Sequence, residues 1–242
     1  MTQKKKIFKY ITLRNLLLIS ILYSFTVVAQ QPQQPVNKDV VKGIQEKEEE
    51  TPFYNGTSVS IDLFGIGSKL FGGDFLSSEV AVEVDLKHMF FPIIELGYGT
   101  TNTTDDTYNI HYKSSAPYAR IGVNFNTMWK KKSDSYIYAG LRYGFSAFKY
   151  DVQSPSLVDD IWGGEVTFNQ TGITSRSQWL EFLVGVKAEI FKNFQMGWSV
   201  RYRARLSAKD NLYSTPWYIP GFGSNKSSNI GVTYNLIYQL PF

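Results

Sequence analysis

The chain of 242 residues contains no cysteine and only two histidines. The absence of cysteine excludes disulfide bonds, thiolate metal sites and a lipid-modified N-terminal cysteine. No His spacing typical of metal ligands is present, so the sequence predicts no bound metal and no cofactor, and it leaves few groups for acid–base catalysis. The formal net charge is only +4. Because much of that charge lies near the N-terminus, a nucleic-acid partner is not expected.

A continuous apolar run long enough to suggest a membrane segment occurs only near the N-terminus. The basic stretch MTQKKKIFKYITLR precedes the apolar stretch LLLISILYSFTVVA, which ends in the small residue Ala29. These are the parts of a secretory signal peptide, and the apolar run is shorter than the roughly 20 residues of a spanning helix. We therefore expect residues 1–29 to be cleaved, with a single transmembrane anchor as the alternative.

The next segment, 30–56, is polar and shows no apolar periodicity. It is rich first in Gln and Pro and then in Glu. This composition is typical of disordered segments. We predict a disordered periplasmic tether over 30–56, followed by a folded domain over 57–242.

From residue 57 onward, apolar and polar residues alternate over about ten residues and then break. In the segment 195–206, one face carries apolar and aromatic side chains, and the other carries Gly, Ser and three Arg. Each segment has about the 9–11 residues of a tilted transmembrane strand. The sequence therefore predicts an all-β fold, an eight-stranded antiparallel up-and-down transmembrane β-barrel. The eight predicted strands are 57–66, 79–88, 93–101, 117–126, 136–148, 178–190, 195–206 and 229–242.

The predicted connections alternate in length. Short ones fall near 89–92, 127–135 and 191–194, and long ones near 67–78, 102–116, 149–177 and 207–228. Barrels of the outer membrane have short periplasmic turns and longer extracellular loops. This pattern predicts an outer-membrane location with the long loops extracellular and both termini periplasmic.

Side-chain volume indicates which face points inward. The interior of an eight-stranded barrel is just wide enough for side chains to fill, and the aromatic face would overfill it. Arginines turned toward lipid would each cost about 2–4 kcal/mol at the midplane. We therefore predict a lumen closed by a salt-bridged, near-balanced charge network, with Ile93, Leu183 and Ile237 as apolar interruptions. Its predicted members are Glu83, Asp85, Lys87, Glu95, Arg120, Arg142, Glu181, Lys187, Glu189, Arg201, Arg203 and Arg205.

Aromatic residues near strand ends are expected at the lipid interface, where barrels carry aromatic girdles. The predicted members are Tyr98, Trp198, Tyr238 and Phe242. A terminal Phe242 on an alternating strand also fits the signal that barrel-assembly machinery selects. The partners expected from the sequence are thus outer-membrane lipid and the assembly machinery during biogenesis, with another envelope protein as a candidate partner.

Three stretches have a familiar sequence: YAGLRYGFSAF at 138–148, WLEFLVGVKAEIF at 179–191 and YIPGFGSNKSSNIGVTYNLIYQLPF at 218–242. They resemble a domain-of-unknown-function family of Bacteroidota outer-membrane β-barrel proteins. The resemblance implies a Gram-negative envelope location and supplies no functional residues. We interpret the YIPGF stretch as part of a loop that folds back over the barrel mouth, with a ligand site as the alternative.

Three functions are compatible with this pattern. The first is a non-enzymatic structural or interaction barrel, with the predicted loop 149–177 as its contact surface. The second is an outer-membrane barrel enzyme acting on lipid A or peptides, in which His111 and the nearby Asp105 and Asp106 would form a rim site. The third is a small channel or a component of a secretion or assembly complex. The other histidine, His88, is expected to be an interfacial residue facing lipid.

Overall fold

The computed structural model describes residues 51–65, 75–105, 109–131, 133–158, 161, 163, 165–209, 211 and 214–241. The predicted signal peptide, residues 30–50 of the predicted tether, Asp106 and Phe242 lie outside the described residues. No helix among the described residues is long and apolar enough to cross a membrane. The described strands are β1 (Tyr54–Asp62), β2 (Phe75–Leu86), β3 (Phe90–Asp105), β4 (Ile110–Asn126), β5 (Tyr136–Val158), β6 (Glu165–Phe191), β7 (Phe194–Ala208), β8 (Tyr218–Ile219), β9 (Gly223–Ser224) and β10 (Ser228–Gln239).

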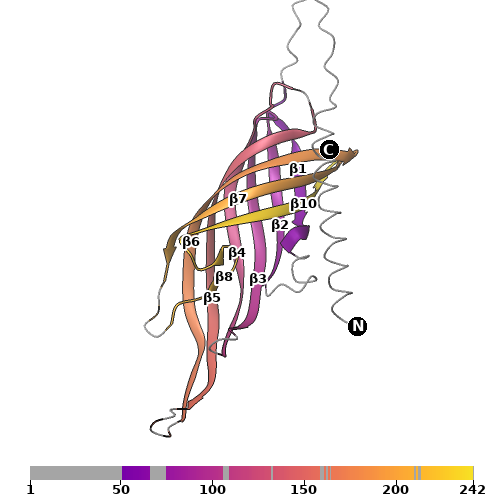
Figure 1. Ribbon diagram of the computed structural model, residues 1–242. Helices are drawn as coiled ribbons and strands as arrows, with labels where there is room; N and C mark the ends of the chain where they lie inside the picture. The colour runs from indigo at the N-terminus through magenta and orange to yellow at the C-terminus, as the bar shows by residue number, and fades with distance from the viewer. Residues whose placement is uncertain are drawn as a thin grey trace, which may run out of the picture.

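Eight of these strands close into an antiparallel barrel (Figure 1). Strands β1 to β6 each pair with the next along the chain, and β10 joins β7 to β1, which completes the ring. Strands β8 and β9 pair only with each other, within the connection between β7 and β10. The predicted all-β, eight-stranded, up-and-down barrel is confirmed. β1 begins at Tyr54, ahead of the predicted domain start at residue 57.

Three short connections gather at one end of the barrel, which we call the turn end: 87–89, 127–135 and 192–193. The first strand starts there and the last one finishes there, because Tyr54 pairs with Leu86 and Tyr238 pairs with Phe194. The opposite end is called the loop end. The β5–β6 hairpin projects from it well beyond the other strands (Figure 1).

The tight turn between β2 and β3 is formed by Lys87 and His88. Both residues have positive φ, 55° and 53°, and Met89 N donates a hydrogen bond to Leu86 O at 3.1 Å. Two central residues with positive φ are typical of a type I′ turn, whose twist matches that of the strands it joins. Asp85 stabilises this non-glycine turn, since its Oδ1 accepts from His88 N at 2.7 Å.

An apolar belt surrounds the barrel, because alternate side chains of every long strand point outward. Members of this belt have exposures that are unusual for side chains of their size, including 61% for Leu96 and 76% for Ile230. Water-soluble monomers rarely expose a continuous apolar surface of this extent. The belt includes Val80, Val82, Ile94, Leu96, Ile121, Leu141, Tyr143, Phe145, Phe182, Val184, Val200, Tyr202, Ile230 and Leu236. An exterior of this kind is the lipid-facing surface of a transmembrane barrel.

Two of the predicted long loops are wrong in their extent. Most of 102–116 and 149–177 continues the strands, and the connections themselves span only 106–109 and 159–164. The apolar face changes side along these strands, which is why alternation alone ended them early. On β5, Tyr143 and Phe145 point outward and are exposed, whereas farther along Phe148 and Tyr150 are buried inside and Lys149 is exposed outside. The reversal marks where the outer surface passes from lipid to water.

Candidate functional site: a closed lumen

Six buried charged side chains fill the centre of the lumen, and we call them the ionic layer. They are Glu79, Glu95, Glu181, Arg120, Arg142 and Arg201. None of the six is more than 6% exposed. The numbers of acids and bases are equal, which is the condition under which so many charges can be buried together.

Glu95 is the centre of this layer. Its Oε1 accepts from Arg142 Nε at 3.0 Å and its Oε2 accepts from Arg201 Nη1 at 2.9 Å. Arg120 Nη1 donates to the same Oε2 at 3.1 Å. One carboxylate from β3 therefore joins guanidinium groups from β4, β5 and β7, and it couples strands on different sides of the ring.

Strand register explains the pairing. Glu95 lies directly opposite Arg120 between β3 and β4, and Arg142 lies opposite Glu181 between β5 and β6. Opposite charges at facing positions stabilise a strand pair. A glycine makes room for one of these long side chains, because a Cβ at Gly122 would lie 2.5 Å from Arg142 Cδ.

The sequence prediction missed Glu79. Its Oε2 accepts a hydrogen bond from Tyr118 OH at 3.0 Å and pairs with Arg120, and its Oε1 lies 3.6 Å from Arg201 Nη2. It could have been found, because Glu79 shares the inward register of Glu83 on the same strand. It is the first residue of the predicted strand, where the alternation has no preceding residue to define it.

A second ion pair, between Glu83 and Lys187, lies on the turn-end side of the ionic layer. Asn124 links the two levels: its Nδ2 donates to Glu83 Oε2 at 2.6 Å, and its Oδ1 accepts from Arg142 Nη2 at 2.8 Å. The Lys187 ammonium also lies over three aromatic rings, with Nζ 5.1 Å from the ring centroid of Phe91. The other two rings are those of Tyr136 and Tyr138.

The turn end of the lumen is an open vestibule of about 720 Å³, bordered by Glu83, His88, Trp129, Tyr136 and Lys187 among others. The cavity at the level of the ionic layer is only about 20 Å³. That volume is close to the smallest that holds one water molecule. The lumen is thus open toward the turn end and filled at its centre.

Several predicted network members lie outside the ionic layer. Lys87 is exposed on the β2–β3 turn because its positive φ ends the strand alternation, so its prediction as a lumen residue is wrong. Asp85 binds His88 at the vestibule, and Glu189 lies half-buried near the turn end. Arg205 bonds the side chain of Asn225 at the loop end. Arg203 lies between the layer and the mouth, with Nε 3.4 Å from Glu181 Oε1.

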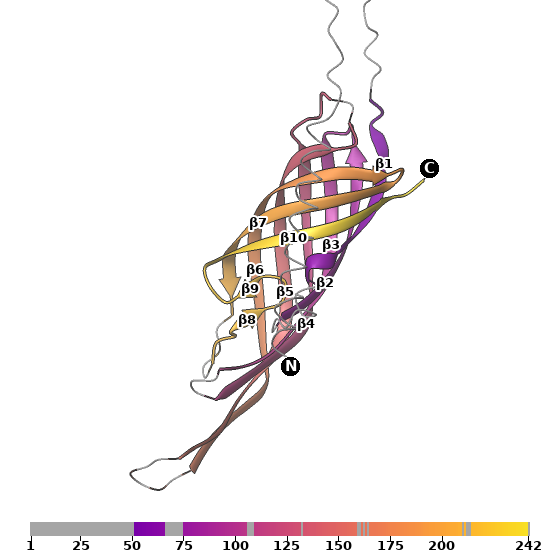
Figure 2. The ribbon, with the colours of Figure 1, turned by 45° about the vertical axis from the view of Figure 1, so that its right-hand side comes forward.

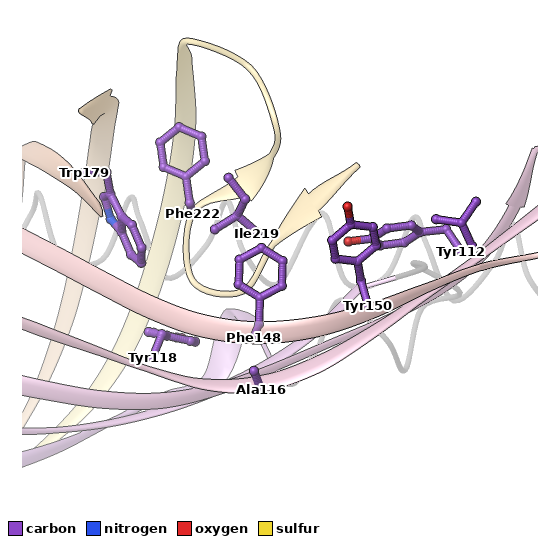
Figure 3. Close-up of a cluster of buried hydrophobic side chains, with 9 residues drawn as sticks. Tyr112, Ala116, Tyr118, Phe148, Tyr150, Trp179, Ile219 and Phe222 are labelled. Atoms are coloured by element: carbon purple, nitrogen blue, oxygen red, sulfur yellow. The ribbon is translucent and has the colours of Figure 1, made fainter. Parts of the chain in front are cut away.

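The mouth at the loop end is closed by the segment 216–224, which we call the plug. It includes the β8–β9 hairpin (Figure 2). Ile219 and Phe222 are fully buried, and they point among Trp179, Phe148 and other aromatic residues of the barrel wall (Figure 3). The ring centroids of Trp179 and Phe222 are 5.8 Å apart. The interpretation of YIPGF as part of a loop that folds back over the mouth is confirmed.

Polar contacts fix the plug to the wall. Arg120 Nη2 donates to Gly221 O at 2.7 Å, and Arg203 Nη1 donates to Phe222 O at 3.2 Å. Tyr112 OH donates to Tyr218 O at 2.9 Å. Arg120 therefore takes part in the ionic layer and also holds the plug, and this connects the two closures of the lumen.

The predicted interface aromatics occupy different environments. Tyr98 and Tyr238 are 49% and 36% exposed on the outer wall. Tyr98 OH also hydrogen-bonds Ser115 Oγ at 2.7 Å, at the loop-end edge of the belt. Trp198 shares the outward register of Val200 on β7, but it is only 8% exposed and stacks on Tyr234 with ring centroids 4.4 Å apart.

His88 faces the vestibule, so the prediction that it faces lipid is wrong. The reversed backbone of the β2–β3 turn directs its ring toward Phe91 and Tyr136. Nδ1 lies 2.9 Å from Asp85 Oδ2, and Nε2 lies 3.1 Å from Ser133 O. Both partners are acceptors, so both ring nitrogens are placed to donate. This arrangement favours the charged imidazolium and connects two turns. The hydrogen bond to Asp85 is the main cause of the raised pKa of His88.

This raised pKa predicts a pH-dependent contribution to stability. A group whose folded pKa exceeds its unfolded value stabilises fully below the unfolded pKa, near 6.5, and loses that contribution as pH rises through the folded pKa. We expect the free energy of unfolding of the wild type to exceed that of His88→Gln most at about pH 5.5. The difference should shrink above the folded pKa, as measured by urea titration in detergent micelles. A difference that grows toward alkaline pH would contradict the double-donor arrangement.

Within the described part of the chain, the second histidine contacts a hydroxyl group of the neighbouring strand. His111 occupies the outward register of β4, and its Nδ1 lies 3.0 Å from Thr104 Oγ1. Among the described residues, no cluster of three or more His, Asp or Glu side chains is arranged to hold a metal ion. The candidate functional feature of the described residues is therefore the lumen, which is closed by the ionic layer and by the plug.

Comparison with known proteins gives the family. Residues 9–242 match the model of a domain of unknown function, DUF6048, and the chain belongs to this family. No curated protein matches the chain.

Similar solved structures include Neisserial surface protein A, with 13% identity, a TM-score of 0.43 and coverage of 77% of this chain and 99% of that one. A major outer membrane protein from Thermus thermophilus has 10% identity and a TM-score of 0.48, with coverage of 76% of this chain and 98% of that one. Acinetobacter baumannii CarO2 has 11% identity and a TM-score of 0.39, with coverage of 78% of this chain and 99% of that one. At these identities, none of the three is a basis for assigning a role to this chain.

Proposed function

We propose that this protein is a non-enzymatic outer-membrane barrel with a permanently closed lumen, which acts as a structural or interaction protein through its projecting β5–β6 hairpin. The main support is that the lumen is closed twice, by the ionic layer and by the plug, and that Arg120 of the ionic layer also donates a hydrogen bond to the plug. The apolar belt supports insertion into lipid. The N-terminal signal pattern and the resemblance to Bacteroidota barrels support a Gram-negative outer membrane.

In this proposal the turn end and both termini face the periplasm, and the loop end is extracellular. Barrel-assembly machinery would insert the chain. The β5–β6 hairpin supports a contact role because its pairing with β4 ends at Gln153, while β5 and β6 continue to pair with each other up to Val158 and Glu165. The outer edges of a two-stranded ribbon are a common docking place for a further strand, here one from a protein partner of the envelope.

The closed lumen predicts the absence of porin-like conductance. In planar bilayers the purified protein should show no steady open current, because the cavity at the ionic layer is only about 20 Å³. Deletion of 217–224 should also leave it closed, since the ionic layer lies below the plug. A steady current of porin size in the wild type would overturn the proposal.

The absence of cysteine makes the orientation directly testable. Lys226→Cys lies at the loop end and Lys192→Cys at the turn end, and both positions are exposed. In intact cells, a membrane-impermeant maleimide should label only Lys226→Cys. Lys192→Cys should react after the outer membrane is permeabilised. Labelling in the reverse order would overturn the proposed orientation.

A further inference from the structure

A group of basic side chains lies on the outer wall, directly beyond the apolar belt at the loop end. On β5, Lys149 is the second outward position beyond Phe145, and on β6, Arg176 is the second beyond Leu180. Both side chains are exposed, as is Lys209, which follows β7. We call Lys149, Arg176 and Lys209 the basic patch.

Strand pairing places these three residues next to one another. Arg176 lies opposite Ala147 and Lys149 lies opposite Thr174, so Arg176 and Lys149 are diagonal neighbours on the same face. Diagonal neighbours on a sheet are about 7–8 Å apart, within reach of long side chains. Lys209 N donates to Arg176 O at 2.9 Å, so Lys209 adjoins Arg176 on the other side.

The patch differs from the cations inside the lumen in its lack of acidic partners. Arg120, Arg142, Arg201 and Lys187 are all ion-paired within the lumen. Across the described part of the chain, no carboxylate is ion-paired with Lys149, Arg176 or Lys209. The three positive charges are thus available to an external anion.

The β2–β3 sector of the wall lacks this charge at the same level, and the exposed Lys113 of β4 lies opposite Asp151 of β5. Outward positions near the loop-end edge of the belt on β2 and β3 are uncharged, namely Ser78, Thr100 and Asn102. In the β5–β6 sector, the belt directly below the patch carries Tyr143, Phe145 and Phe182, which are 40%, 40% and 55% exposed. A molecule lying on this sector would meet clustered cations at one end and a broad apolar surface along its length.

We propose that the basic patch binds the phosphate groups of a lipid A molecule in the outer leaflet. This inference rests on the proposed outer-membrane location. At that location, headgroup phosphates lie at the level where the apolar belt ends, and acyl chains lie along Tyr143, Phe145 and Phe182. Arg176 can engage a phosphate with two parallel N–H donors, and Lys149 and Lys209 add mobile point charges. Each basic residue near an anionic lipid surface strengthens binding about fivefold.

The test uses the mature, full-length barrel in detergent micelles, with native mass spectrometry to measure bound lipid. The probes are diphosphorylated lipid A and the same lipid A after enzymatic dephosphorylation. The wild type should prefer the phosphorylated form, and Lys149→Gln/Arg176→Gln/Lys209→Gln should bind it on the order of a hundredfold more weakly. Lys130→Gln/Lys131→Gln/Lys192→Gln removes the same charge at the turn end and should bind like the wild type.

Each other outcome overturns the inference. Equal binding of both lipid A forms would show that the patch does not recognise phosphate. Equal losses of lipid A binding in both triple variants would indicate general charge attraction. Phosphatidylglycerol competing as well as lipid A would indicate a patch for any lipid phosphate. Lys149→Gln alone, expected to weaken binding about fivefold, keeps the test decisive if the triple variant does not fold. Failure of the outer-membrane location would appear separately, in the cysteine-labelling experiment.

Discussion

Replacing Glu95 with glutamine is expected to lower the free energy of unfolding by about 3–5 kcal/mol, because removal of one member of a buried ionic group leaves its partners uncompensated. Arg142 would then lose the carboxylate that it binds in the ionic layer, and Arg120 and Arg201 would keep Glu79 and Glu181. Glutamine has the same shape as glutamate, so the loss of unfolding free energy measures the contribution of the charge. Urea titration of the micelle-folded barrel, followed by tryptophan fluorescence, gives the value.

Glu189→Gln is the matched control for this prediction. Glu189 lies near the turn end and outside the ionic layer, so its substitution should change the free energy of unfolding by no more than about 0.5 kcal/mol. Glu95→Gln/Arg201→Gln restores the balance of charge and should be less destabilised than the sum of the single variants. Equal effects of Glu95→Gln and Glu189→Gln would show that the ionic layer contributes nothing specific to stability.

Replacing Gly221 with valine is expected to release the plug from the mouth while the barrel stays folded. Gly221 has a φ of +81°, and a Cβ there would lie 2.5 Å from Cγ of the buried Tyr118 ring. Positive φ alone costs a non-glycine residue about 1–3 kcal/mol, and the clash with a packed ring adds to it. Chymotrypsin cleavage at Trp217 and Phe222 should accelerate at least about tenfold, the factor that corresponds to 1.4 kcal/mol.

Gly172→Val is a control for positive-φ strain outside the plug. Gly172 has a similar φ of +67°, but nothing lies within 4 Å of a Cβ built there. This variant should leave cleavage at Trp217 and Phe222 unchanged. Gly221→Val should also remain non-conducting, because the ionic layer closes the lumen below the plug. Unaltered cleavage in Gly221→Val would mean that the mouth does not depend on the close contact between Gly221 and Tyr118.

The sequence predicted the architecture well because alternation with period two reflects a simple physical condition. Each strand in the belt separates lipid from a crowded polar lumen, so apolar and polar side chains alternate regularly along β7, and on β3 Phe91 and Ile93 interrupt the polar face. The same condition reverses beyond the belt, where water replaces lipid outside and the plug fills the inside. Phe148 and Tyr150 continue the strand with the opposite polarity, and a search for one apolar face therefore assigned their segment to a loop.

The sequence by itself determined the class of fold, the direction in which arginines such as Arg201 point, and the return of YIPGF to the mouth. These three features follow from the pattern of polar and apolar residues within single segments of the chain, so the sequence alone is enough to predict them. Only the tertiary structure decided that Glu95 joins three arginines, that Lys87 lies outside the lumen, and that Arg120 connects the ionic layer to the plug. Ring closure and register bring these residues together from distant strands, and no local pattern encodes such distances.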